Sequence, residues 1–187
     1  MTALSTVLTH LDRRIPGKPE RIEMVDAINV ALTEVGKVTK IDATLTVTEN
    51  ATSYSLPSGV HDVVRVEVAR DTSSDTTYDI IGHWHEINGT IYLTQELPYS
   101  DGNTIRLYYN DSPDAVTDNT DTIDNAIPMD LLCAIAAYRY EYTKFYNQSN
   151  MATKDQGILE SLRTEMMLAK SKYRVRRMSR DPILGRY

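Results

Sequence analysis

The spacing of apolar residues changes twice along this chain, and this change restricts the possible folds more than any other feature. Before about residue 44 and after about residue 127, apolar side chains recur every three or four residues, which is typical of helices with one buried face. Between Thr44 and Asn110 they alternate with polar residues, which is typical of half-buried strands. The pattern predicts an α+β fold in which helices flank a central antiparallel β-strand region, arranged as a small sheet or a sandwich.

Two helices are predicted before the strand region, over about residues 3–13 and 19–36. Pro19 suits the first turn of the second helix, because its φ angle is helical and an N–H there needs no helical partner. Glu20 and Glu23 suit the positive N-terminal end of the helix dipole. Helical spacing runs through Leu4, Val7, Leu8 and Leu11 in the first helix, and through Ile22, Val25, Ile28, Leu32 and Val35 in the second.

The strand region, within residues 44–110, contains a clear turn signal. Asn88-Gly89 separates two short apolar stretches, and it favours the type I′ turn of a β-hairpin because both central residues of that turn need positive φ. Alternation of apolar and polar residues is strongest around Val64, Val66 and Val68 and around Ile105, Leu107 and Tyr109. These stretches predict antiparallel strands with one buried face.

The last third of the chain is predicted to be a connection, a helical hairpin and a tail. Residues 111–125 are polar and acidic, so we expect a surface connection. Two apolar stripes predict helices over about 128–147 and 153–175, packed as an antiparallel helical hairpin. Beyond them the helical pattern is lost, so residues 173–187 are predicted to form an extended basic tail, and residues 1–172 a single α+β body.

Composition and motifs point away from an enzyme and from a membrane protein. Apolar residues make up 41% of the chain, and no apolar run reaches the roughly 18 residues of a membrane span. The chain has a single cysteine, Cys133, and contains no Gly-x-Ser-x-Gly, Walker or His-Glu-x-x-His motif. We therefore expect no catalytic residue and no cofactor, and a reducing compartment.

His83 and His85 are the best candidates for metal ligands, because alternate residues of a strand place both imidazoles on one face. Two ligands are too few for a zinc site, and further ligands would have to come from Asp79 or His61. We expect no metal site. Histidines at a protein interface are the better interpretation.

Tyrosine is unusually frequent, with 12 residues beside one Phe and one Trp. A tyrosine ring buries a large apolar area while its hydroxyl can stay hydrated, which suits surfaces that become buried only on assembly. The candidate interface with a neighbouring subunit or with the next component of an assembly consists of His83, Trp84, His85, Tyr99 and Tyr108.

Charge is distributed unevenly along the chain. Residues 163–187 hold eight Lys/Arg and two Asp/Glu, whereas residues 1–162 hold 12 and 24. The tail residues expected to dock on a partner are Tyr173, Arg174, Arg176, Arg177, Met178, Arg180, Pro182, Ile183, Leu184, Arg186 and Tyr187. Neutralising phosphate requires none of the apolar side chains in this set, so we favour a protein groove over nucleic acid as the partner.

Taken in order, these features resemble those of the head-to-tail adaptor proteins of tailed bacteriophages, also called head-completion or neck proteins. The features are the segment YSLP at residues 54–57 leading to the strand VVRVEVAR, the hairpin INGTIYL, the strand TIRLYYN, the acidic connection and the helix that starts at Ile127-Pro128. The resemblance covers about residues 18–187. It rests on the order of the features, since no single motif among them is diagnostic.

The resemblance implies a structural subunit of a homo-oligomeric ring, usually a dodecamer, bound beneath the portal vertex and lining the DNA channel. A stopper, tail tube or tail nozzle protein would attach below, and the segment from Tyr173 to Tyr187 would bind the portal protein. Genomic DNA would pass the acidic body without specific binding. The protein would belong to the neck of the virion, after assembly in the cytoplasm of the host bacterium, with no membrane involved.

Two alternatives remain open on the sequence. One is an accessory assembly subunit of a capsid or tail that does not sit at the portal. The other is a nucleic-acid-binding module that uses the basic C-terminal tail.

Overall fold

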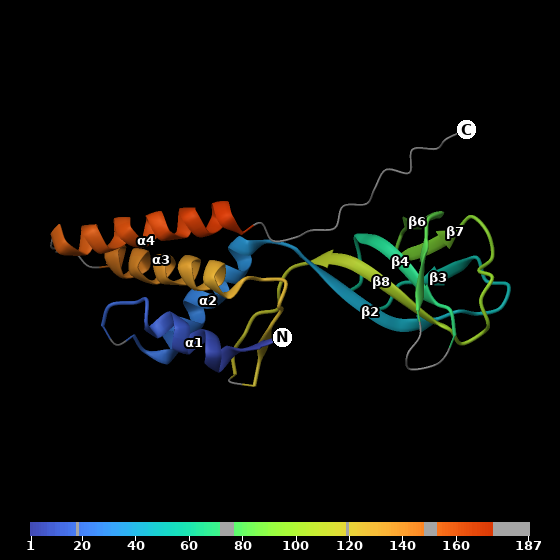
Figure 1. The fold of residues 1–187 in the computed structure, drawn as a ribbon, viewed down its shortest axis with the longest axis horizontal. Helices are drawn as coiled ribbons and strands as arrows, with labels where there is room; N and C mark the ends of the chain where they lie inside the picture. The colour runs from blue at the N-terminus through green and yellow to red at the C-terminus, as the bar shows by residue number, and fades with distance from the viewer. Residues whose placement is uncertain (18, 72–76, 119, 148–152, 174–187) are drawn as a thin grey trace. The chain divides into compact units, whose positions relative to one another are not determined.

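The computed structural model describes residues 1–17, 19–71, 77–118, 120–147 and 153–173 (Figure 1). Within these residues the chain forms two compact units. The helical unit comprises Met1–Val38 and residues 112–173, and the β unit comprises Thr39–Asp111. The expectation of a single body over residues 1–172 stays a prediction.

The described part of the helical unit contains four helices, each of which was predicted. They are α1 (Leu4–Asp12), α2 (Arg21–Val35), α3 (Met129–Asn147) and α4 (Thr153–Lys172), and α3 contacts each of the other three. The two short strands β1 (Thr2–Ala3) and β9 (Thr122–Ile123) pair in antiparallel fashion in the same unit. Together with the strands of the β unit, these elements confirm the α+β fold class.

Local sequence accounts for both ends of α2. At its start, the backbone N–H of Glu20 donates to Glu23 Oε2 at 3.2 Å, so the first turn is capped by a side chain three residues ahead. At its end, Gly36 adopts a φ of 77°, which glycine tolerates because it has no Cβ. The boundaries of this helix therefore follow from residue types at its two termini.

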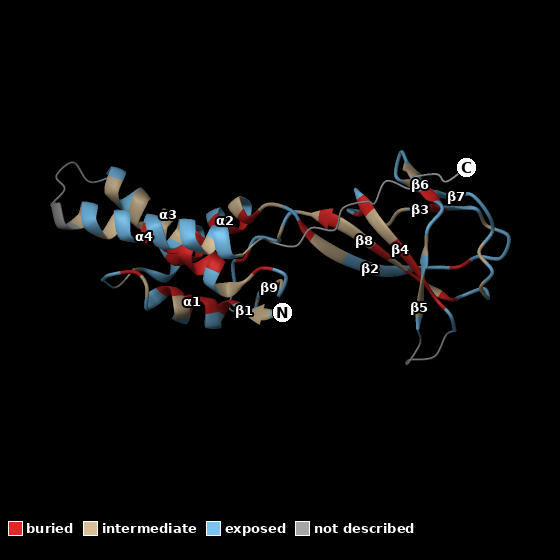
Figure 2. Cartoon of the chain, turned by 45° about the horizontal axis from the view of Figure 1, so that its top comes forward, coloured by how far each residue is buried: buried red, intermediate tan, exposed pale blue. Residues whose placement is uncertain are grey.

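The centre of α3 is buried on all sides. Every residue from Leu131 to Ala137 is buried, which is the pattern of a helix in the middle of a bundle rather than on its surface (Figure 2). The same core cluster includes Leu11 of α1, Ile28 of α2 and Leu162 of α4. None of the described helices combines the length and apolar character that crossing a bilayer requires.

The acidic connection is less exposed than the sequence predicts. Val116 is 1% exposed and Ile123 is 4% exposed, and both belong to the core of the helical unit. The side chain of Asn29 holds this segment, since its Nδ2 donates to Val116 O at 2.9 Å and its Oδ1 accepts from Val116 N at 2.8 Å. Val116 and Ile123 are isolated apolar residues in a polar segment, so they show no helix or strand periodicity that would predict burial. Only the tertiary structure shows that they are buried.

The strands of the β unit form two antiparallel sheets. The four-stranded sheet has the order β2-β8-β4-β5, and the three-stranded sheet has the order β3-β7-β6. Their bounds are Val38–Thr46 (β2), Ser53–Ser55 (β3), Val63–Ala69 (β4), Tyr78–Ile81 (β5), Trp84–Ile87 (β6), Thr90–Leu93 (β7) and Thr104–Asp111 (β8). The inner faces of both sheets contribute to one core, to which Val66 and Leu107 belong on one side and Tyr54 and Ile91 on the other.

The hairpin signal at Asn88-Gly89 is confirmed. β6 and β7 pair in antiparallel fashion around it, and Asn88 and Gly89 have φ angles of 50° and 73°. Positive φ at both positions is the geometry that a type I′ turn requires, and it matches the twist of the flanking strands.

The predicted limits of the strand region, 44–110, are wrong at both ends. β2 begins at Val38, β8 ends at Asp111, and the small β1–β9 pair lies outside the region altogether. Thr39 Oγ1 donates to Asn110 Oδ1 at 3.0 Å, and Lys40 Nζ donates to Asp111 Oδ2 at 3.0 Å. The start of β2 thus depends on contacts with residues far along the chain, which local alternation does not reveal.

Replacing Asn29 by Ala should lower the free energy of unfolding of the helical unit by about 1–3 kcal/mol, because the backbone N–H and C=O of Val116 would lose their partners. Urea unfolding followed by the helical circular dichroism signal measures this change. Thr33→Ala is the control on the same helix, since Thr33 is exposed and its hydroxyl donates to the Asn29 carbonyl oxygen of the preceding turn, so its loss should change stability by less than about 0.5 kcal/mol. Equal stability of Asn29→Ala and the wild type would contradict this account.

Candidate partner-binding surfaces

The described residues contain no set of groups prepared for catalysis on a metal. No three His, Cys, Asp or Glu side chains among them lie close enough together to hold a metal ion. Cys133 is buried, and burial raises the pKa of its thiol to about 11. The thiol therefore stays protonated at neutral pH, and a protonated thiol is a poor nucleophile.

Three of the four residues considered as metal ligands, His85, Asp79 and His61, have other partners in the structure. His85 stacks on Tyr92 with the ring centroids 5.4 Å apart. The Asp79 carboxylate accepts hydrogen bonds from Arg70, at 2.6 Å from Nη2, and from the Tyr99 hydroxyl at 3.0 Å. His61 Nδ1 lies 3.0 Å from the carbonyl oxygen of Gly59. Asp79 is thus engaged in an ion pair, and its pKa is lowered chiefly by the hydrogen bond from Arg70.

The five candidate interface residues do not share one surface. Trp84 is 7% exposed and packs in the β core, so its ring offers no free surface to a partner. His83 and His85 are exposed, whereas Tyr99 and Tyr108 are half-buried. We therefore keep the two histidines and the two tyrosines as candidates and leave Trp84 out.

The outer face of the four-stranded sheet gathers arginine and tyrosine side chains. Along β4 and β8, residues that alternate with the buried Val66, Val68, Ile105 and Leu107 point away from the core. Glu67 is paired in register with Arg106 on one side and with Ile80 on the other, while Arg65 is opposite Tyr108. We call the set Arg65, Glu67, Tyr78, Ile80, Arg106 and Tyr108 the arginine–tyrosine face.

Contacts within the arginine–tyrosine face hold its side chains in place. Glu67 is only 5% exposed, and its carboxylate pairs with Arg65 and accepts a hydrogen bond from the Tyr108 hydroxyl at 2.8 Å. Burial and this hydrogen bond raise the pKa of Tyr108, so its hydroxyl remains a donor. The Arg106 guanidinium carbon lies 3.5 Å from the ring centroid of Tyr78. The face therefore presents a stacked arginine beside a carboxylate that is already neutralised.

The outer face of the three-stranded sheet carries no charged side chain. The cross-strand pairs Ser53–Tyr92 and Tyr92–His85 form one row, and Ser55–Thr90 and Thr90–Ile87 form the next. Tyr92 is 39% exposed and Ile87 is 51% exposed. We call these six residues the uncharged face, and their composition resembles the centre of a protein interface, where charge is depleted and tyrosine is enriched.

Only the first residue of the predicted tail lies within the described residues. The Tyr173 backbone N–H donates to Ala169 O at 2.8 Å, and its hydroxyl lies 3.4 Å from Asp130 Oδ2 on α3. Tyr173 therefore packs with the helical unit as an extension of α4. The other predicted docking residues, from Arg174 to Tyr187, lie outside the described residues.

An ionic cluster joins the three longest helices of the helical unit. Glu34 of α2 pairs with Arg139 of α3 and accepts a hydrogen bond from Lys170 of α4 at 3.0 Å. Glu34 is partly buried, which acts to raise the pKa of its carboxyl, but the hydrogen bonds and charges of Arg139 and Lys170 lower that pKa overall. The carboxylate is thus held in its charged form between two cations.

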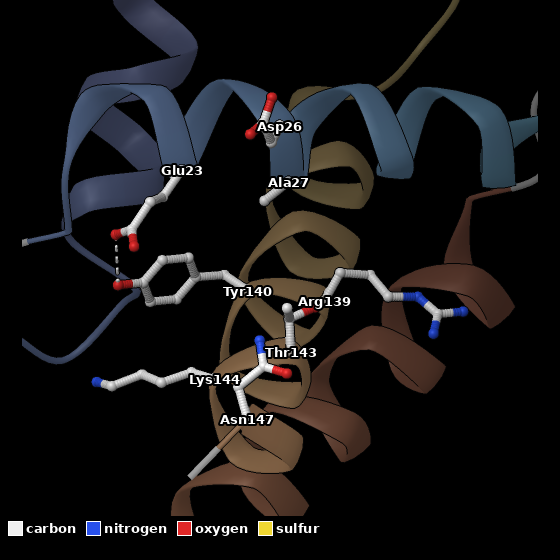
Figure 3. A pocket seen from close by; sticks show the side chains of 8 residues that line it. All are labelled: Glu23, Asp26, Ala27, Arg139, Tyr140, Thr143, Lys144 and Asn147. Carbon is white, nitrogen blue, oxygen red and sulfur yellow. Dashed lines mark hydrogen bonds between the residues drawn. The ribbon is translucent and has the colours of Figure 1, made fainter.

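A cleft of about 400 Å³ lies between α2 and α3 (Figure 3). Its lining residues are Glu23, Asp26, Ala27, Arg139, Tyr140, Thr143, Lys144 and Asn147. The Tyr140 hydroxyl donates to Glu23 Oε2 at 3.2 Å, and burial together with this nearby carboxylate raises the pKa of Tyr140 to about 12. The carboxylates of Glu23 and Asp26 and the amine of Lys144 line the cleft beside the neutral Tyr140, so the cleft can accept a polar side chain of a partner.

Comparison with protein families shows to which family the chain belongs. The model of the SU10 adaptor protein family matches residues 2–182, which include both structural units. The chain belongs to the SU10 adaptor protein family. Comparison of this adaptor with the curated proteins gave no match.

The family agrees with the sequence interpretation at the level of a structural phage assembly protein. Phage adaptors are structural components of the virion rather than typical enzymes, which fits surfaces composed of paired charges and aromatic rings. The family match does not extend to the adaptor's predicted place at the neck, to its ring or to its individual partners.

Sequence reasoning missed the arginine–tyrosine face, the uncharged face and the cleft. The alternation in VVRVEVAR and TIRLYYN already indicates that Arg65, Glu67, Arg106 and Tyr108 share the polar side of their strands. It does not indicate that β4 and β8 are neighbours, because nothing local specifies strand order. The cleft has no sequence signal, since it depends on how α2 crosses α3.

Glu34→Gln should lower the free energy of unfolding by about 1–3 kcal/mol at pH 7, because both cations lose their charged partner. The folded-state pKa of Glu34 is below its usual 4.5, so this contribution is present above pH 4.5 and is lost as the pH falls through the folded-state value. The difference in free energy of unfolding between Glu34→Gln and the wild type should therefore decrease at acidic pH. Urea unfolding at a series of pH values measures it.

The control for this experiment is Glu160→Gln. Glu160 pairs with Arg163 at 3.6 Å on the surface of α4, with both side chains more than half exposed, so the variant should change stability by less than about 0.5 kcal/mol at any pH. A Glu34→Gln effect that stays constant from neutral to acidic pH would show that the loss does not come from the charge.

Proposed function

We propose that this adaptor is a subunit of a homo-oligomeric ring, with twelve copies expected, that joins the portal vertex of a phage head to the tail or to the next neck component. The single observation that carries the proposal is the family match over residues 2–182. A ring subunit needs several partner surfaces and no reacting groups. The two sheet faces and the cleft provide such surfaces among the described residues.

Charge supports a role beside DNA that involves no specific binding. Residues 1–162 hold 12 Lys/Arg and 24 Asp/Glu, so this part of the adaptor repels a polyanion. A ring that lines the DNA channel would then let genomic DNA pass without retaining it. The stopper, tail tube or tail nozzle protein would attach on the side away from the portal.

The C-terminal segment is proposed to bind the portal protein. Residues 174–187 contain five arginines, which can form charge-assisted hydrogen bonds with carboxylates of a partner. They also contain Met178, Ile183, Leu184 and Tyr187, which can fill apolar pockets. One such segment would bind weakly, but copies displayed together on a ring would bind through a high effective concentration.

Truncation after Tyr173 tests the role of this segment. The full chain should co-sediment with purified portal rings of the same phage at about one copy per portal subunit, and the truncated chain should not. Ending the chain at Tyr173 keeps its contacts with Ala169 and Asp130, so the helical unit should keep its thermal unfolding midpoint.

Binding of both forms to portal rings would show that the segment is not the docking element. Failure of both forms to bind would refute the portal as a partner, and the accessory-subunit alternative would then be favoured. Equal thermal unfolding midpoints of the full chain and the truncated chain exclude a folding defect as the cause of either result.

Alanine at Ile183, Leu184 and Tyr187 separates the protein-groove interpretation from the nucleic-acid alternative. Burying these three side chains should stabilise a protein complex by roughly 1.5–3 kcal/mol each, so the triple variant should lose portal binding by at least about a hundredfold. The matched variant replaces Arg174, Arg176 and Arg177 by Gln. If the tail serves nucleic acid instead, only the arginine variant should lose binding to duplex DNA, and that binding should fall steeply with salt.

A further inference from the structure

One cation of the β unit has no carboxylate partner within the described residues. Lys40, Arg65 and Arg70 pair with Asp111, Glu67 and Asp79. Arg106 contacts the Tyr78 ring, but in the part of the chain that the structure describes no Asp or Glu lies within ion-pair distance of it. An arginine that a fold holds in place without a counter-charge is prepared to accept one from a partner.

The position of Arg106 suits recognition of a carboxylate. Its guanidinium carbon is 3.5 Å from the Tyr78 ring centroid, so the ring supports one face of the planar group. Stacking leaves the N–H groups at the edge of the guanidinium plane free to donate two parallel hydrogen bonds to a carboxylate. Because the side chain is already ordered, less conformational entropy is lost when a partner binds.

The surroundings of Arg106 favour a protein partner. Ile80, 62% exposed, lies in the same cross-strand row as Glu67 and Arg106 and offers an apolar contact at the surface. Glu67 itself is buried, its charge is balanced by Arg65, and it accepts a hydrogen bond from Tyr108, so it would repel an approaching carboxylate only weakly. Arginine and tyrosine are among the residue types that are enriched at the energetic centres of protein interfaces.

DNA is a poor occupant for this face. Residues 39–111 hold four Lys/Arg and 11 Asp/Glu, so Arg106, which has no carboxylate partner among the described residues, lies within a unit of net charge −7. Binding of a duplex depends on neutralising several phosphates at once. The same charge balance makes another copy of this chain a suitable occupant, because its β unit offers many carboxylates.

The geometry points to a contact between the arginine–tyrosine face of one subunit and an acidic surface of a second copy of this chain, with Arg106 binding a carboxylate of that copy. This inference rests on the proposed ring. Neighbours in a ring meet through two different surfaces, so a cationic face on one copy must find its counter-charge elsewhere on the next. The arginine–tyrosine face has a net positive charge, and the rest of the β unit is strongly acidic, so a second copy can supply the carboxylate that Arg106 needs.

Zero-length cross-linking tests the contact directly. Arg106→Lys places an amine at this position, and a carbodiimide joins an amine only to a carboxylate in contact with it. On portal rings loaded with the adaptor, the variant should give a covalent dimer of this chain, and mass spectrometry should find residue 106 joined to an Asp or Glu peptide of the second copy. Arg70→Lys is the matched control, because its amine faces Asp79 of its own chain and should cross-link within one copy.

Alanine variants test the energetic role of the same residue. Arg106→Ala should weaken association between copies at least about tenfold in analytical ultracentrifugation of portal-loaded rings, whereas Arg70→Ala should leave it unchanged. Arg70 directly follows β4, its side chain is 61% exposed, and it already pairs with Asp79, so the comparison separates a cation with a carboxylate partner from one that has none among the described residues. Equal thermal unfolding midpoints of the two variants exclude a folding defect.

The outcomes separate this inference from the proposed function. If the wild type loads portal rings but residue 106 cross-links to the portal protein, or to nothing, the contact between copies is refuted and the portal role stands. If the wild type does not load portal rings, the portal role is refuted. Cross-linking of Arg106→Lys in the concentrated free protein then tests whether two copies contact each other through this face. Absence of a dimer joined through residue 106 would refute that contact.

Discussion

Burial of the central turns of α3 is the constraint on which the helical unit depends. Residues from Leu131 to Ala137 are buried on every side, so α1, α2 and α4 must all pack around them. These helices come from both ends of the chain, with the whole strand region inserted between them. The Glu34 cluster lies at the edge of this core, where it joins three helices without a large cost of burying charge.

In the β unit, apolar and polar residues alternate along the strands. This alternation places apolar side chains in one core shared by the two sheets and leaves two outer faces that differ in composition. Inward side chains of both sheets contribute to one cluster that includes Trp84, Val66 and Leu107. Most of the outward side chains are polar, but one face carries arginine and tyrosine while the other carries no Asp, Glu, Lys or Arg. In a ring, one surface of each subunit contacts a different surface of the next subunit, and two outer faces of different composition suit such a contact.

Several charged or titratable groups of the described chain are engaged within the chain itself. Cys133 is kept protonated by burial, Asp79 is paired with Arg70, and Glu67 is paired with Arg65 and accepts a hydrogen bond from Tyr108. Groups satisfied by their partners hold neighbouring side chains in place. For a structural phage adaptor, ordered side chains at a surface reduce the entropy lost on assembly.

The sequence by itself determined the four helices, the presence of a strand region between them, the α+β class and the hairpin at Asn88-Gly89, because these depend on periodicity and on backbone preferences within a few residues. The ends of α2 follow from Glu23 and Gly36 for the same reason. Tertiary structure alone decided the strand order, the early start of β2 at Val38 and the burial of Val116. It also decided that Arg106 stacks on Tyr78 without a carboxylate among the described residues, because these contacts join residues far apart in the chain.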